Sequence, residues 1–121
     1  MNIIFGDAVN QLSKDYVTLE LDTITIQPIK YKVKTWCVIE NVPAEEMSSI
    51  ELNKKLHNDL LIEYRNQNWD ACAENIDQLL GSWSGEVDTF YHTLLERIDL
   101  YRKYPPEPGW DGSVQRNLIE S

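Results

Sequence analysis

The sequence predicts an α+β fold, in which an antiparallel β-hairpin is followed by about three helices. Apolar and polar residues alternate in the first third of the 121-residue chain, as they do in half-buried strands. After Pro43 the apolar residues recur every three or four positions, as they do on one face of a helix. This length supports one modest core, so we expect a single small domain over residues 1–121. We expect a helix or loop and the hairpin in 1–42, helices in 43–104, and a proline- and tryptophan-containing tail in 105–121.

The hairpin is predicted from two segments separated by a turn. The stretch "YVTLELDTITI" alternates apolar and polar residues, and the alternation changes parity at Asp22-Thr23. This change predicts a bulge or twist in one long strand, or a break between two strands. The stretch "QPIK" predicts a turn, and "YKVKTWCVIE" is rich in the residue types that favour strands. We expect Tyr16–Ile26 to pair with Tyr31–Ile39, and helices to cover the apolar face of the pair.

The helical part is predicted in three segments. The first helix is expected to begin at a capping box formed by Ser48 and Glu51 and to end near residue 65. The second is expected over about 69–80, where Gly81 would end it. The third is expected to begin at Asp88, a good capping residue, and to end before Pro105.

The tail combines stiff and flexible positions around one tryptophan. Pro105, Pro106 and Pro108 restrict the chain, and glycines on either side of Trp110 allow it to turn. We therefore expect Trp110 to dock on the helices near Trp69 and Leu95. Asp111 is expected to cap the turn or to accept a backbone hydrogen bond. The last segment, "QRNLIES", is expected to fray.

An alternative for the same region is an exposed interface. Aromatic residues near loops and helix ends anchor protein partners when their rings are exposed. The residues that this alternative concerns are Trp69, Trp83, Tyr101, Tyr104 and Trp110.

Charge and hydropathy exclude two classes of partner. Eleven basic and twenty acidic side chains give a net charge of −9, whereas nucleic-acid binders need a basic surface. One local exception is Lys30, Lys32 and Lys34, which alternate along a strand and form either a solvated face or a small anion site. The chain has no apolar run of membrane length and no signal-peptide pattern, so we expect no membrane contact and a cytoplasmic location.

The cysteines and histidines do not follow the spacing of a metal site. Cys37, Cys72, His57 and His92 lie far apart, and no pair of them has a zinc-ligand spacing. We expect two buried, reduced thiols and no metal or cofactor. The sequence also has no glycine-rich phosphate loop and no nucleophile elbow.

Two families share patterns with the helical part. "YRNQNWDACAENIDQLL" resembles tetratricopeptide repeats, with Tyr64 near the end of one helix and Trp69 opening the next. One and a half such units are too few for a solenoid, so we expect three helices packed on a hairpin. A more specific series of motifs runs through Tyr64-Arg65, Trp69, Glu96-Arg97-Ile98, Pro105-Pro106 and Trp110-Asp111-Gly112.

This series resembles the helical tail that follows the catalytic core of many bacterial class III nucleotide cyclases. The strand region is similar to the last part of that core, with Leu21-Asp22 and Val38-Ile39-Glu40 at corresponding places. In this register Asn2–Asp15 corresponds to a helix before the hairpin. The cyclase core binds two metal ions through two aspartates on early strands, and this chain has no corresponding pair.

The N-terminal "GDAVN" resembles a different segment of the cyclases, in a register that excludes the first one unless residues are deleted between them. In that family the asparagine ending this string and an arginine four residues later stabilise the transition state. Here the two positions are Asn10 and Lys14, and lysine does not reproduce the planar fork of a guanidinium group. The resemblance therefore implies a non-catalytic interaction or regulatory module that binds a protein partner or a second copy of itself. The alternative is a partial cyclase, acting as a dimer or completing another chain, in which Asn10 and Lys14 face nucleotide.

Overall fold

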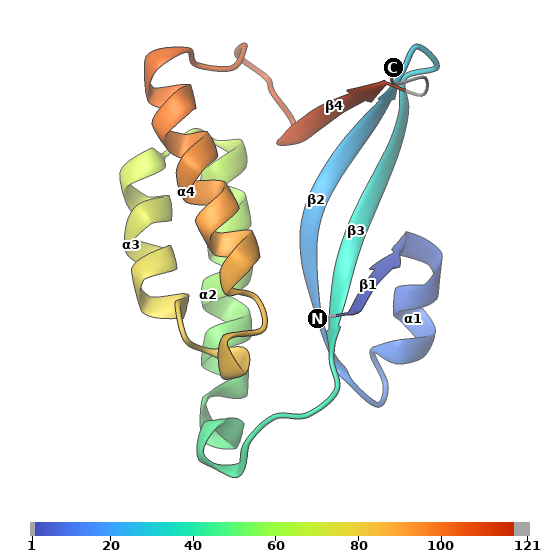
Figure 1. The fold of residues 1–121 in the computed structure, drawn as a ribbon, viewed down its shortest axis with the longest axis vertical. Coiled ribbons are helices and arrows are strands. Elements are labelled where there is room, and N and C mark those ends of the chain that lie inside the picture. The colour runs from blue at the N-terminus through green and yellow to red at the C-terminus, as the bar shows by residue number, and fades with distance from the viewer. Residues whose placement is uncertain (1, 118–121) are drawn as a thin grey trace. The chain divides into compact units, whose positions relative to one another are not determined.

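The computed structural model describes residues 2–117 and confirms the α+β class (Figure 1). The chain divides into two compact units. The sheet unit comprises Met1–Glu40 and Asp111–Ser121, and the helical unit comprises Asn41–Trp110. The chain passes from one unit to the other between Glu40 and Asn41, and again inside the predicted tail, between Trp110 and Asp111. Among the described residues, no helix is long and apolar enough to cross a lipid bilayer.

The sheet unit is built on the predicted hairpin. Its strands are β1 (Asn2–Phe5), β2 (Val17–Gln27), β3 (Tyr31–Ile39) and β4 (Ser113–Asn117), in the order β1-β3-β2-β4. β3 is antiparallel to both β1 and β2, whereas β4 runs parallel to β2. The expected pairing of the two hairpin strands is confirmed, with β2 displaced by one residue from its predicted bounds.

The parity change in β2 is a β-bulge. The pairing register between β2 and β3 shifts between Glu20 and Thr23, so that Leu19 opposes Cys37 before the shift and Ile24 opposes Val33 after it. The Thr35 hydroxyl accepts a hydrogen bond from the backbone N–H of Asp22 at 3.1 Å and donates one to the carbonyl of the same residue at 3.3 Å. A threonine side chain therefore bonds to the backbone groups that the bulge removes from the ladder.

The helix expected over Asn2–Asp15 is wrong. Residues 2–5 form β1, and they are followed by a 3-10 turn, η1 (Gly6–Ala8), and a short helix, α1 (Val9–Leu12). The apolar run "NIIF" is too short to show its period, and pairing with β3 decides its conformation. The expectation that "QRNLIES" frays is also wrong for residues 115–117, which pair with Thr25–Gln27. Residues 118–121 lie outside the described part of the chain.

The helical unit contains the three predicted helices, α2 (Ile50–Arg65), α3 (Trp69–Leu79) and α4 (Asp88–Lys103). Two 3-10 segments precede them, η2 (Ala44–Ser49) before α2 and η3 (Trp83–Gly85) before α4. The core residues are fully or almost fully buried, and include Leu60, Leu61, Tyr64, Cys72, Ile76, Leu79, Trp83, Val87, Phe90, Tyr91, Leu94 and Ile98.

Both predicted N-terminal caps are wrong. Ser48 lies inside η2, and α2 begins after Ser49 without a capping side chain. Asp88 is the first residue of α4, and its carboxylate accepts a hydrogen bond from the Gly81 N–H at 2.9 Å. Gly81 follows the end of α3 with φ +86°, which confirms it as the stop. The carboxylate of Asp88 therefore closes the loop between two helices and does not cap its own helix.

Candidate functional site

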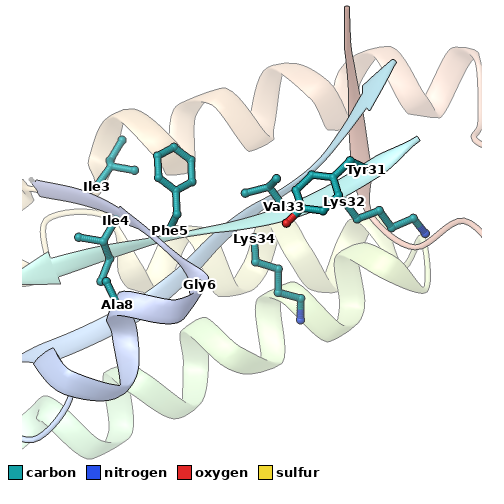
Figure 2. A pocket seen from close by; sticks show the side chains of 9 residues that line it. All are labelled: Ile3, Ile4, Phe5, Gly6, Ala8, Tyr31, Lys32, Val33 and Lys34. Carbon is teal, nitrogen blue, oxygen red and sulfur yellow. The ribbon is translucent and has the colours of Figure 1, made fainter. Parts of the chain in front are cut away.

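A groove opens in the sheet unit where β1 ends and β3 continues. Residues Asn2–Phe5 of β1 pair with Val38–Thr35, which is only part of β3. The chain then turns away from the sheet at Gly6, so residues 31–34 pair with β2 on one side and with no described strand on the other. The groove beside them has a volume of about 650 Å³ (Figure 2). It is lined by Ile3, Ile4, Phe5, Gly6, Ala8, Tyr31, Lys32, Val33 and Lys34.

Three large side chains of the groove are more than half exposed. Ile3, Phe5 and Tyr31 are 56%, 62% and 61% exposed. Phe5 opposes Thr35, so it lies on the same face of the sheet as the odd-numbered residues of β3. Figure 2 shows Ile3 and Phe5 pointing to the same side of the strands. Exposed apolar side chains grouped on one face of neighbouring strands are typical of an interaction surface.

The two lysines of the groove lie on the opposite face of β3 and are partly neutralised. Lys32 forms an ion pair with Asp111, and the Lys34 ammonium lies 3.5 Å from a carboxylate oxygen of Glu20. The hydrogen bond from Lys32, followed by bonding to Ser113, holds the pKa of Asp111 well below its usual range. Lys30 belongs to the hairpin turn, with φ +57°, so the predicted three-residue stripe is reduced to two residues of the strand.

Three residues of the alternative interface pack against one another in the helical unit. Trp69, Tyr101 and Trp110, together with Tyr64, form an aromatic cluster. All six distances between the four ring centroids lie between 5.1 and 6.4 Å. Rings at these distances are in direct contact, which leaves no space between them for a ligand. The predicted docking of Trp110 near Trp69 is confirmed, whereas a contact with Leu95 stays a prediction.

Tyr64 is the most buried ring of the aromatic cluster. It is 4% exposed, and burial, followed by the neighbouring Tyr101, raises the pKa of its hydroxyl, while Arg97 opposes the shift. The phenol therefore stays neutral at physiological pH. The sequence placed Tyr64 on an inner helix face, but it did not indicate that the tail would meet this side chain.

The remaining tail residues have structural roles. Gln67 donates hydrogen bonds from its amide to the carbonyls of Pro106 and Glu107, at 3.4 and 3.3 Å. Pro105 is exposed and Pro106 half-buried. Asp111 accepts a hydrogen bond from the Ser113 N–H at 3.0 Å, as the sequence predicted.

Trp83 does not fit the prediction of an exposed anchor. It is only 2% exposed, because it begins the 3-10 segment η3 inside the helical unit and its side chain forms part of the core. Tyr104, by contrast, is 72% exposed at the end of α4.

Asn10 and Lys14 do not take part in the groove. Asn10 lies on α1 and Lys14 on the turn after it, and both are exposed. Neither lines the hollow shown in Figure 2. Nucleotide binding by these two residues stays a prediction.

The cysteines are buried, as expected. The side chains of Cys37 and Cys72 are both fully buried, and burial, followed by the nearby Glu63, raises the pKa of Cys72 to about 12. His57 is fully buried, and its Nδ1 lies 2.9 Å from the Tyr91 hydroxyl. Among the described residues, no group of three or more histidine, cysteine or acidic side chains could hold a metal ion.

Comparisons of the chain with protein-family models, curated proteins and solved structures found no match. The similarity to the C-terminal part of class III cyclases therefore stays a prediction.

Proposed function

We propose that this chain is a non-catalytic interaction module that binds a protein partner through the groove between β1 and β3. The observation that carries the proposal is the group of exposed aliphatic and aromatic side chains, Ile3, Phe5 and Tyr31, beside an open edge of β3. Exposed aromatic and aliphatic side chains around a hollow are the usual anchors of protein interfaces.

The groove supports this function better than the tail does. The rings of Trp69, Tyr101 and Trp110 contact one another within the helical unit, so less of their surface can contact a partner. Tyr31 and Phe5 are each more than half exposed. The centre of the proposed interface thus lies in the sheet unit and not at the Pro-Pro segment.

The chemistry of the groove favours binding over catalysis. Besides aliphatic and aromatic carbon, its lining side chains present the Tyr31 hydroxyl and two lysine ammonium groups, and both lysines already contact carboxylates. General acid–base or nucleophilic catalysis needs a group of matched pKa held beside a partner that activates it. The lining of the groove provides contact area and positive charge, which are properties of a docking surface.

The test compares affinity capture by the wild-type chain with capture by two double variants. Ile3→Ser with Tyr31→Ser removes two groove side chains, whereas Leu52→Ser with Tyr104→Ser removes side chains of comparable exposure from the helical unit. Each is used as immobilised bait in extract of the native host, and captured proteins are quantified by mass spectrometry. We expect the groove variant to lose a protein that the wild-type and the control variant both retain. Equal recovery by all three baits would contradict the proposal.

A further inference from the structure

We propose that the groove receives an extended polypeptide segment, which adds to the sheet as a strand antiparallel to β3 and in line with β1. This inference rests on the proposed function and specifies the partner at the same site. β3 has nine residues, of which β1 pairs with the four from Thr35 to Val38. The part of this edge beyond the end of β1, Tyr31–Lys34, has β2 on one side and the groove on the other. We call this four-residue segment the open edge.

The open edge has unmet hydrogen-bonding capacity. In an antiparallel ladder alternate residues direct both N–H and C=O to the same side, so two of the four residues present their backbone groups to the groove. Four residues at strand spacing extend over about 13 Å, enough for a short segment to pair. β1 already defines the position and direction of such a strand, because it pairs with the adjoining part of the same edge (Figure 2). Strand addition of this kind obtains affinity from main-chain hydrogen bonds.

The two faces of the open edge specify the side chains of the partner. Tyr31 and Val33 share a face with Phe5, so partner residues on that face should be apolar. Lys32 and Lys34 lie on the other face, where acidic partner residues would fit. Each ammonium group has three donors, and the carboxylates of Asp111 and Glu20 leave further donors available. The segment that fits is therefore one that alternates apolar and acidic residues.

Charge argues against a second copy as the occupant. An antiparallel pairing of two open edges that keeps Tyr31 opposite Val33 places the Lys32 side chains of the two copies face to face. Like charges directly opposite one another destabilise a strand pair. Lysines on an exposed edge discourage self-pairing, and the same lysines favour an acidic partner.

The first experiment uses the full chain and peptides selected from a random octapeptide display library. Enriched peptides are synthesised, and their affinities are measured by fluorescence anisotropy. We expect enriched sequences to alternate apolar and acidic residues. Each peptide is then N-methylated at alternate residues in one of two frames. N-methylation of the residues that face β3 should weaken peptide binding at least about tenfold, because it removes main-chain hydrogen-bond donors. N-methylation of the residues that face outward should change the affinity less than about twofold.

Variants and amide exchange test the same model on the protein. The double variant Lys32→Gln with Lys34→Gln retains most of each side chain and removes both charges. It should weaken the binding of the selected peptides about three- to tenfold. Asn10→Ala with Lys14→Gln, outside the groove, should leave affinity unchanged. Bound peptide should slow backbone amide exchange within Tyr31–Lys34. Melting curves of both variants establish that they fold, and the N-methyl comparison uses the wild-type chain alone.

Several outcomes would overturn the inference. The first is that the wild-type chain enriches no peptide from the library. The second is that N-methylation in the two frames weakens peptide binding equally. The third is that the wild-type chain sediments as a dimer and Tyr31→Ser sediments as a monomer. If groove variants lose a captured protein while the two frames act equally, the interaction function stands and strand addition is wrong. If capture does not depend on the groove at all, the proposed function itself fails.

Discussion

The indole ring of Trp110 lies against the phenol ring of Tyr64, with centroids 5.1 Å apart and planes inclined by 58°. These two residues are separated by most of the helical unit in sequence. Their contact brings the end of the proline-rich segment back to the C-terminal end of α2. Trp69 and Tyr101 complete the aromatic cluster, so one tail residue touches rings from all three helices.

Replacing Trp110 with alanine should destabilise the helical unit. The change removes contacts with three rings and opens space in a packed cluster, which costs about 2–4 kcal/mol for a partly buried indole. We expect the melting temperature to fall by about ten degrees, measured by circular dichroism. The melting temperature of Trp110→Phe should fall by less than half as much. Tyr104→Ala removes an exposed ring, and its melting temperature should stay close to that of the wild-type chain. A shift under two degrees for Trp110→Ala would mean that the cluster contributes little stability.

Removing the Tyr91 hydroxyl should weaken the core of the helical unit. Tyr91→Phe deletes the hydrogen bond to His57 Nδ1, and both residues are fully buried. Losing one partner of a buried hydrogen bond costs about 1–3 kcal/mol, and chemical denaturation would measure it. Tyr104→Phe removes a hydroxyl from a residue that is 72% exposed, and should be neutral to within about 0.5 kcal/mol. If Tyr91→Phe were as stable as Tyr104→Phe, the hydrogen bond between Tyr91 and His57 would make no measurable contribution to stability.

The two cysteines should be unreactive in the folded chain. Cys72 has a pKa of about 12, so roughly one thiol in ten thousand is ionised at pH 8, and both thiols are buried. Ellman's reagent should modify neither thiol within minutes under native conditions. Both should react at once in 6 M guanidinium chloride. Rapid modification of one thiol in the native chain would show that its surroundings open easily.

The ion pair between Lys32 and Asp111 should make the sheet unit sensitive to acid. The pKa of Asp111 is lowered in the folded chain, chiefly by Lys32, so its contribution is present above the ordinary carboxyl pKa of about 4. That contribution declines as the pH falls from about 4 towards the lower folded pKa. Asp111→Asn should therefore be less stable than wild type at pH 7, and this difference should shrink by pH 2.

Urea titrations at both pH values would measure the difference. Asp99→Asn is the matched control, because it removes one exposed negative charge from α4. An Asp111→Asn deficit of the same size at pH 2 and pH 7 would contradict a contribution from the ionised carboxylate.

The sequence by itself determined the elements whose apolar period is long enough to read. The hairpin, an irregularity at Asp22-Thr23, the three helices and the stop at Gly81 follow from local patterns, and the structure shows that the irregularity is a bulge. The turn around Trp110 could also be predicted, because Gly109 and Gly112 flank it in the sequence, and both have positive φ in the structure. In each case neighbouring residues along the chain carry the information.

The tertiary structure decided everything that depends on pairing between distant segments. β1 and β4 are strands because each pairs with an edge of the hairpin. With four and five residues, both segments are too short to show an alternation of apolar and polar residues. The burial of Trp83 and the meeting of Trp110 with Tyr64 depend on how helices pack. The groove exists because β1 is shorter than β3, and no local pattern in the sequence encodes that difference. The sequence of a strand specifies which side chains lie on each face. The length of its unpaired edge depends on where the neighbouring strands end.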